Sequence, residues 1–227
     1  MAVSGLTSSL LPPDLRQRLA ELLPAGRPVR FGVGQKLLAQ GDRSGHIAII
    51  TSGVVKITAS VSNGREALLG LRGAGEVVGE LAALDGQPHS ATVRALDDVR
   101  ARLIATSTFR QHLRSNPDAL LAVLAAVVTR LRESDRRRLE FSGFDVPQRV
   151  SLLLVELAQT HGQPGVDGVV TISLALSQEE IAEATGASRE AVAKALRRLR
   201  EEGTVLTGRR RIVIKRMDRL IGHSEHE

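Results

Sequence analysis

The chain has 227 residues, of which 42% are hydrophobic, so it is long enough for one large domain or two modest ones with a real core. Lysine and arginine exceed the acids by 31 to 25, which gives a net charge of +6 at pH 7. The absence of cysteine excludes disulfides, thiolate catalysis and cysteine-ligated iron–sulfur clusters. Aromatic residues make up only 2% of the chain, which excludes stacking of bases on aromatic platforms as a main binding mode.

The sequence shows no sign of membrane insertion or export. No apolar run reaches the roughly 18 residues of a membrane-spanning helix. Residues 1–9, which we expect to be disordered, lack the pattern of a secretion signal. We therefore expect a cytoplasmic protein without a membrane partner.

Short apolar segments separated by glycine turns fill residues 28 to 104. A helix over 10–23 is expected before them, and the regular spacing of the segments favours a sandwich or barrel of about eight strands. Asn63-Gly64 between two strand-like segments is the strongest hairpin signal. The predicted strands are 29–31, 36–39, 47–51, 54–61, 67–71, 77–78, 91–95 and 99–103.

Helices follow the β section. The first is predicted over 106–113, capped by Thr106 or Ser107, and a long one from Pro117 to about Phe141. Large apolar residues recur along the long helix in steps of three and four, which suits packing against a partner helix. We favour a homodimer seam over packing on the β section alone. The apolar residues are Leu120, Leu121, Leu124, Val127, Val128, Leu131, Leu139 and Phe141.

Residues 142–147 break the long helix and are interpreted as a hinge. A helix from Pro147 to about Thr160, a loop over 161–168 and a strand over 169–174 are expected next.

Residues 177–200 are typical of two short helices joined by a tight turn. Ser177 is a good N-cap, with Glu180 at the capping-box spacing. Gly186 suits the left-handed end of the first helix, and Ser188 caps the second. The inner face of the second helix is expected to hold Val192, Ala195, Leu196 and Leu199.

This is the pattern of a DNA-binding helix-turn-helix, whose second helix presents its first residues to base edges in the major groove. Arg189 can pair with guanine, Glu190 can accept from cytosine, and Lys194 can reach a guanine or a phosphate. Segment 188–220 holds eleven lysines and arginines against four acids, or +7, so the charge excess of the chain is confined to it. That confinement favours a polyanion partner over a merely basic surface.

Residues 204–207 and 211–214 can pair through Gly208-Arg209-Arg210, which would place a β-wing beside the second helix, and residues 217–221 close the chain.

A glycine-punctuated β-roll, a long helix and a winged helix-turn-helix, in that order, resemble the cyclic-AMP receptor / fumarate-nitrate regulator (CRP/FNR) family of bacterial transcription factors. The resemblance covers roughly residues 25–220, and its most specific segments are 41–42, 79–81, 144–149 and 186–194.

The resemblance implies an α+β fold in three parts. An N-terminal double-stranded β-helix, or jelly-roll, of the cyclic-nucleotide-binding kind is expected over 1–115. A long dimerisation helix with its hinge is expected over 116–144, and a C-terminal winged helix-turn-helix over 145–227.

By the same resemblance, Arg189, Glu190 and Lys194 read a TGTGA-type half-site, although many relatives carry arginine where this chain has Lys194. Ser177, Gln178 and Ser188 fall where relatives touch phosphates, as helix N-termini do. The implied partners are double-stranded DNA, a second copy of the chain and, for an activator, RNA polymerase.

In the cyclic-AMP branch the β-roll holds the effector. Gly79-Glu80-Leu81 matches the segment that presents backbone N–H groups to the cyclic phosphate and a carboxylate to the ribose. Ser90 matches one phosphate ligand, but His89 stands where relatives have the phosphate arginine. A neutral histidine offers one donor, whereas arginine offers a permanent charge and a bidentate fork. For His89 alone, a loop residue at the solvent edge is the alternative interpretation.

The adenine contacts of relatives come from the long helix. In relatives these contacts are made by two adjacent polar residues, a Thr-Ser or Thr-Asn pair. Ser134 and Asp135 stand at the two positions in this chain, with Arg130 one turn earlier. Asp135 introduces a negative charge at a usually neutral position. Three possibilities remain open: cyclic AMP bound weakly or in a changed pose, another ligand such as a different nucleotide, or a vestigial site in a protein that binds DNA without a ligand.

We find no sequence pattern of an enzyme, zinc site or phosphate loop, and therefore expect no catalytic residues. The six histidines show no metal-ligand spacing except His223 and His226 in the polar tail, so neither a metal nor a covalent cofactor is expected. A nucleotide-binding module that acts on a protein partner is the competing function, against which Arg189, Glu190 and Lys194 argue.

Overall fold

A computed structural model describes residues 13–60, 66–208 and 210–225. The chain divides between Arg132 and Glu133 into two compact units, so the boundary falls inside the long helix. The expected disorder of residues 1–9 and the Asn63-Gly64 turn lie outside the described residues.

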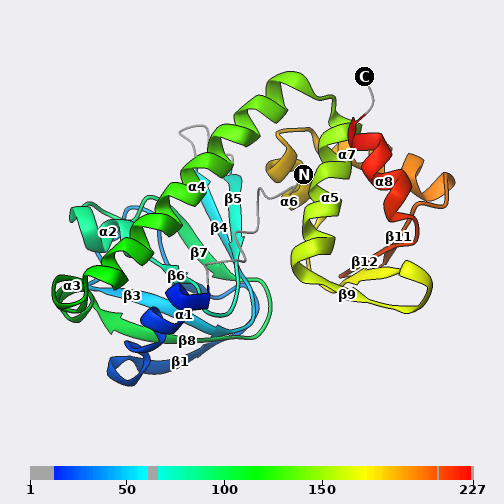
Figure 1. The fold of residues 1–227 in the computed structure, drawn as a ribbon. Coiled ribbons are helices and arrows are strands. Elements are labelled where there is room, and N and C mark those ends of the chain that lie inside the picture. The colour runs from blue at the N-terminus through cyan, green and yellow to red at the C-terminus, as the bar shows by residue number, and fades with distance from the viewer. Residues whose placement is uncertain (1–12, 61–65, 209, 226–227) are drawn as a thin grey trace. The chain divides into compact units, whose positions relative to one another are not determined.

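The N-terminal unit is built on two four-stranded antiparallel sheets (Figure 1). The strands are β1 (Arg27–Phe31), β2 (Lys36–Leu38), β3 (His46–Ser52), β4 (Val55–Ser60), β5 (Glu66–Arg72), β6 (Val77–Val78), β7 (Thr92–Ala95) and β8 (Val99–Ala105). One sheet has the order β1-β8-β3-β6 and the other β2-β7-β4-β5. Every predicted strand is confirmed to within two residues at each end, and the antiparallel β4–β5 pair confirms the hairpin.

Four α-helices accompany the sheets: α1 (Pro13–Ala20), followed by the 3-10 turn η1 (Leu23–Ala25), then α2 (Glu80–Asp85), α3 (Thr106–Ser115) and α4 (Pro117–Gly143). The predicted cap of α3 is wrong, because Ala105 is its N-cap and makes no side-chain cap. Strand β8 runs directly into the helix, and the amide of Thr106 donates instead to the Gly45 carbonyl, at 2.9 Å.

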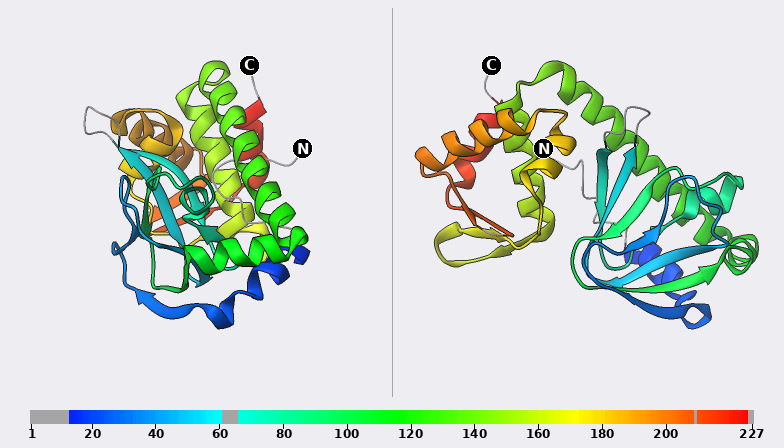
Figure 2. Two further views of the ribbon diagram at one scale, coloured as in Figure 1. Left: turned by 90° about the vertical axis from the view of Figure 1, so that its left-hand side faces the viewer. Right: turned by 180° about the vertical axis from the view of Figure 1, so that it is seen from behind.

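Two apolar cores hold this unit together. One lies between the two sheets and includes Ile50, Val55 and Val93. The other lies between the first sheet and the helices (Figures 1 and 2), where Phe109 is completely buried. Both faces of the first sheet are therefore covered, as expected for a sheet whose strands contribute apolar residues in both directions.

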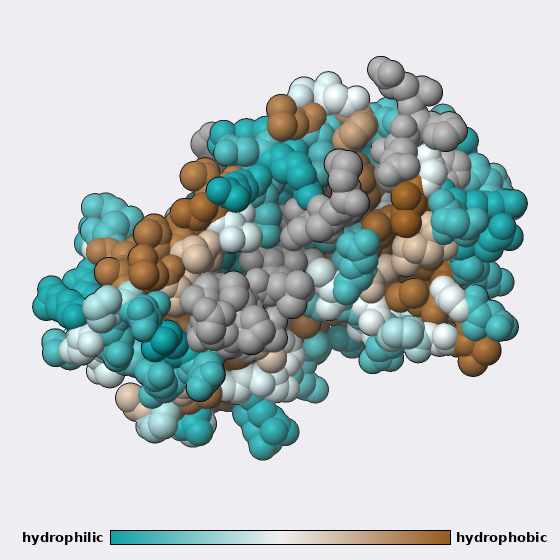
Figure 3. Space-filling model, viewed as in Figure 1, coloured by the Kyte–Doolittle hydropathy of each residue, from teal (hydrophilic) through white to brown (hydrophobic). Residues whose placement is uncertain are grey.

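Helix α4 has two different apolar faces. Small residues face the core, and Ala119, Ala122, Val123 and Ala126 are buried there. The large residues point away from it and form an α4 stripe along the N-terminal half of the helix (Figure 3). The stripe consists of Leu120, Leu121, Leu124, Val128 and Leu131, with exposed fractions of 44, 62, 54, 39 and 60%.

The C-terminal unit contains a helical group and one four-stranded sheet of order β11-β12-β10-β9. The helices are α5 (Val146–His161), α6 (Gln178–Thr185), α7 (Arg189–Glu201) and α8 (Met217–Glu225). The strands are β9 (Gly162–Pro164), β10 (Val170–Ile172), β11 (Val205–Gly208) and β12 (Arg211–Ile214). The hinge prediction agrees with the end of α4 at Gly143 and the start of α5 at Val146.

The predicted loop over 161–168 is partly wrong, because it contains β9 and the 3-10 turn η2 (Val166–Gly168). Glycine and proline are poor strand formers, so β9 has no signal in its own composition. It forms because Gly162, Gln163 and Pro164 pair with β10. Asp167 turns the chain with a φ of 56°.

Candidate DNA-binding surface and effector site

Helix α6 begins at the predicted capping box. The Ser177 hydroxyl accepts from the Glu180 amide at 3.2 Å, and the Glu180 carboxylate accepts from the Ser177 amide at 2.7 Å. The two contacts satisfy amides that the first helical turn would leave without partners.

The turn between α6 and α7 depends on Gly186, which adopts φ 59° and ψ 36°. This left-handed conformation suits glycine. A Cβ atom at this position would lie 3.5 Å from the Phe141 ring, so the turn rests on the last part of α4. The guanidinium of Arg149 lies 5.4 Å from the centre of the same ring and donates to the Phe141 carbonyl at 3.2 Å. These contacts join the hinge region to the helix-turn-helix.

Helix α7 is anchored by its inner face. The Ser188 hydroxyl accepts from the Ala191 amide at 3.2 Å, as an N-cap does. The predicted inner residues, which are Val192, Ala195, Leu196 and Leu199, are all buried. Burial on one side fixes which side chains face outward.

Arg189, Glu190 and Lys194 are exposed on the opposite side of α7. Hydrogen bonds from its own backbone amide and from the Ser188 hydroxyl lower the pKa of Glu190, so the carboxylate is ionised and can accept from a base amino group. Ser177, Gln178 and Ser188 are exposed at the starts of α6 and α7, where backbone amides favour anions.

The predicted wing is confirmed as the antiparallel pair β11–β12, in which Gly208 lies opposite Arg211. It follows α7 directly, as the right-hand view of Figure 2 shows in orange and red. A hydrogen bond of 3.1 Å from Arg200 to the Thr207 hydroxyl ties the helix to the wing.

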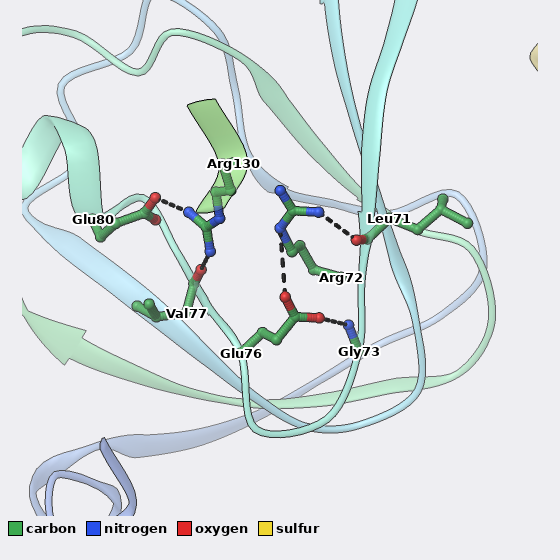
Figure 4. A network of polar contacts seen from close by, with 7 residues as sticks. All are labelled: Leu71, Arg72, Gly73, Glu76, Val77, Glu80 and Arg130. Carbon is green, nitrogen blue, oxygen red and sulfur yellow. Dashed lines mark hydrogen bonds and ion pairs between the residues drawn. The ribbon is translucent and has the colours of Figure 1, made fainter. Parts of the chain in front are cut away.

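In the N-terminal unit, Glu80 is the centre of the predicted effector site. Gly79 precedes it with a φ of 85°, and the Glu80 side chain is 3% exposed at the start of α2. Arg130 of α4 forms an ion pair with Glu80 and donates to the Val77 carbonyl at 3.1 Å (Figure 4). The structure therefore brings Glu80 and Arg130, two of the predicted effector residues, together.

His89 is buried, with 5% exposure, so its interpretation as a solvent-edge residue is wrong. Its loop folds back on Asp42, whose carbonyl accepts from the His89 amide at 2.9 Å. The ring nitrogen Nε2 lies 2.5 Å from the Ser44 hydroxyl, and Cε1 would lie 3.3 Å from a Cβ atom at Gly79. Burial lowers the pKa of His89, against smaller opposing effects of Asp42 and Glu80, and so favours the neutral ring at pH 7.

The other predicted effector residues are exposed. Leu81 and Ser90 lie at the surface of the N-terminal unit. Ser134 and Asp135 belong to the C-terminal unit, where both are exposed and Asp135 pairs with Arg138 at 3.6 Å. Their contribution to an effector site stays a prediction.

Sequence reasoning missed a buried ion pair at the end of β5. Arg72 is 5% exposed and Glu76 is 2% exposed, with 3.6 Å between the Arg72 Nε and Glu76 Oε1 atoms. Arg72 also donates to the Leu71 carbonyl at 2.6 Å, and Glu76 accepts from the Gly73 amide at 2.6 Å (Figure 4). The sequence signal for this pair was Arg72 itself, a charged residue that follows the apolar segment 67–71 and directly precedes the turn at Gly73.

Within residues 13–60, 66–208 and 210–225, no cluster of three or more histidine, aspartate or glutamate side chains could hold a metal ion. None of the helices described in the structure combines the length and apolar character needed to cross a bilayer.

Two segments match known domain families. Residues 28–116 match the cyclic nucleotide-binding domain, and residues 148–222 match the Crp-like helix-turn-helix domain. The chain is 33% identical over 203 residues to the CRP-like cAMP-activated global transcriptional regulator of Mycobacterium tuberculosis, which covers 89% of this chain and 90% of that relative. The chain belongs to the CRP/FNR family of transcription regulators. The predicted family and fold class are thereby confirmed.

Solved structures of other proteins have the same fold. FixK2 from Bradyrhizobium japonicum superposes with a TM-score of 0.76 at 20% identity, covering 89% of this chain and 98% of that one. The c-di-GMP responsive global regulator CLP from Xanthomonas campestris gives 0.75 at 24% identity, covering 87% and 98%. The proteins similar to this chain thus include one named as cAMP-activated and one named as c-di-GMP responsive.

Proposed function

We propose that this protein is a homodimeric, cytoplasmic transcription regulator that reads a TGTGA-like palindrome under the control of a nucleotide in the β-roll. The observation that carries the proposal is the outward set Arg189, Glu190 and Lys194 on a helix whose other face is buried. Double-stranded DNA is the main partner, and RNA polymerase is a second partner if the protein is an activator.

The α4 stripe supports the homodimer. Five large aliphatic residues exposed on one helix are more than a monomer normally leaves in water. Two copies that pair through these residues form a dimer with two-fold symmetry, which matches the two-fold symmetry of a palindromic DNA site. The two recognition helices must then enter major grooves about one helical turn apart, roughly 34 Å.

Glu80 and Arg130 support control by a nucleotide. A buried carboxylate at the start of α2 is suited to accept from ribose hydroxyls, and in this structure it holds Arg130 instead. A nucleotide that competes for Glu80 would release Arg130, which lies on α4. The resulting change in α4 would pass through residues 142–147 to the recognition helix. Cyclic AMP and cyclic di-GMP are the first ligands to test, since similar regulators respond to them.

The proposal is tested by measuring binding to a labelled TGTGA palindrome and to a scrambled duplex at physiological salt, with and without cyclic AMP. Arg189→Ala should lose about 1–3 kcal/mol on the palindrome and little on the scrambled duplex. Arg197→Ala is the matched control, since Arg197 is exposed on the same helix beyond the base-reading residues. No preference of the wild type for the palindrome, or an equal loss on both duplexes, would refute base reading.

A further inference from the structure

Arg72 occupies the interior of the β-roll. In the β4–β5 pair it lies directly opposite Val55, and residues directly opposite each other in a sheet point to the same face. Val55 is fully buried in the core between the two sheets. The arginine side chain therefore lies on the face of the sheet that carries this aliphatic core, with the buried Glu76 carboxylate as its partner.

Two guanidinium groups from different elements converge on consecutive residues. Arg72, from β5, pairs with the side chain of Glu76, whereas Arg130, from α4, donates to the carbonyl of Val77. Figure 4 shows both groups beside this segment, each with a carboxylate partner, Glu76 for Arg72 and Glu80 for Arg130. All five residues belong to the N-terminal unit.

The fold itself does not need this charge. Desolvating an arginine and a glutamate costs several kcal/mol per ion, and a well-packed apolar pair in their place is often neutral or stabilising. A methionine opposite Val55 would fill the same interior without that cost. Arg72 is therefore best explained by binding an anion that the aliphatic core cannot bind.

The site also lacks its expected cation. Position 89 holds a buried histidine bonded to Ser44, which offers no permanent charge. The permanent positive charges near a phosphate bound next to Glu80 must therefore come from arginine side chains, of which Arg130 already pairs with that carboxylate. Guanidinium groups are the side chains best matched to phosphate, because they donate two parallel N–H bonds.

We propose that Arg72, together with Arg130, binds the phosphate group of a nucleotide effector and supplies the charge that His89 does not. The inference rests on the proposed function, because it concerns the same effector site. Glu80 then accepts from the ligand's hydroxyl groups, and Glu76 keeps its hydrogen bond to the Gly73 amide. Effectors without a phosphate are excluded from tight binding.

Calorimetric titration of the full-length protein with cyclic AMP, cyclic di-GMP and adenosine tests the proposal. Arg72→Met should weaken binding of the phosphate-bearing ligand by roughly 10- to 100-fold, the loss expected for a charge-assisted contact, and leave adenosine unchanged. Arg94→Met is the control, because Arg94 lies between the inward residues Val93 and Ala95 on β7 and faces outward. It should bind like the wild type.

A second pair of variants separates binding from stability, since Arg72→Met leaves Glu76 buried without its cation. The double variant Arg72→Met with Glu76→Gln removes both charges and keeps an acceptor for the Gly73 amide. It should show the same loss of phosphate binding. Glu76→Gln alone removes the competing carboxylate and should tighten phosphate binding, whereas a purely structural ion pair predicts no gain.

Equal affinity of wild type and the double variant would overturn the proposal, as would failure of the wild type to bind either phosphate-bearing nucleotide at about 1 mM, a concentration that detects even weak complexes. Binding to the palindrome and to the scrambled duplex, measured in the same proteins with and without each nucleotide, separates this inference from the proposed function. A wild type that prefers the palindrome under none of these conditions refutes the proposed function. A wild type that prefers the palindrome but binds nucleotide independently of Arg72 refutes only this inference.

Discussion

The ring of His89 is held by the hydroxyl of Ser44, 2.5 Å from Nε2, inside the β-roll at the position where the family resemblance places the phosphate arginine of relatives. A buried ring in this position has two consequences. It removes a permanent charge from the effector site, and it makes the stability of the N-terminal unit depend on pH.

Acidification should destabilise the protein through His89. Burial lowers the pKa of His89 below its ordinary value of about 6.5, so the unfolded chain binds more protons than the folded one, and stability rises with pH in this range. The contribution is complete above pH 6.5 and is lost as pH falls toward the folded-state pKa. His46, whose pKa is lowered mainly by burial and then by His89, adds to the effect.

The measurement is the melting temperature between pH 7.5 and 5.5, for wild type and His89→Gln. Glutamine keeps a donor and an acceptor near Ser44 and does not titrate, so the variant should show a shallower pH dependence. An identical dependence in both proteins would show that His89 does not control acid stability.

A side chain at the turn glycine, Gly186, should destabilise the protein. Gly186→Ala should cost about 1–2 kcal/mol, because φ 59° brings a Cβ atom close to the following carbonyl oxygen. Strain in the backbone is the cause, since the 3.5 Å approach to Phe141 is an ordinary contact. Urea unfolding of the two proteins measures the difference.

Gly143→Ala is the matched control for the turn. Gly143 is the last residue of α4. Apart from the adjacent residues and the backbone of its own helix, no atom lies within 4 Å of the place that a Cβ atom would take there. Alanine favours a helix by up to about 1 kcal/mol over glycine, so this variant should be as stable as wild type or more stable. Equal effects of the two substitutions would contradict a special role of the turn.

Arg198 should contribute to DNA affinity without reading sequence. Its Nε atom lies 2.8 Å from the Glu202 carboxylate, at the end of α7 away from the base-reading residues. Arg198→Ala should weaken palindromic and scrambled DNA alike and reduce the slope of log affinity against log salt by about one unit. Glu202→Gln removes the competing carboxylate and should strengthen both. An unchanged salt slope in Arg198→Ala would take this residue out of the DNA footprint.

The α4 stripe should control assembly. Leu124→Glu places a carboxylate at the middle of the apolar stripe, and two copies facing each other across a dimer seam would repel and be desolvated. Sedimentation equilibrium should show a dimer for wild type and a monomer for the variant. Val33→Glu, which replaces an exposed aliphatic residue outside α4, should stay dimeric. A monomeric wild type would remove the two-fold arrangement on which palindrome reading depends.

The local elements and the recognition surface could be predicted from the sequence, because their causes are short-range. Glycine turns and alternating apolar residues define β1 to β8, and Ser177, Gly186 and Ser188 define the ends of α6 and α7 through contacts within four residues. Once a helix has one apolar face, the exposure of Arg189, Glu190 and Lys194 follows from its period. Strand β9 could not be predicted, since only pairing with β10 makes its glycine and proline extended.

The tertiary structure alone decided which charged groups lie inside the β-roll. Arg72 enters the core because strand pairing places it opposite Val55. A bulge in the β4–β5 pair determines which β5 residues face the core, and no local sequence pattern reveals that bulge. His89 is buried because residues 45 positions apart in the chain, Ser44 and His89, meet there. Sequence patterns specify backbone conformation and the polarity of a face over a few residues, whereas burial and charge pairing depend on contacts between distant segments.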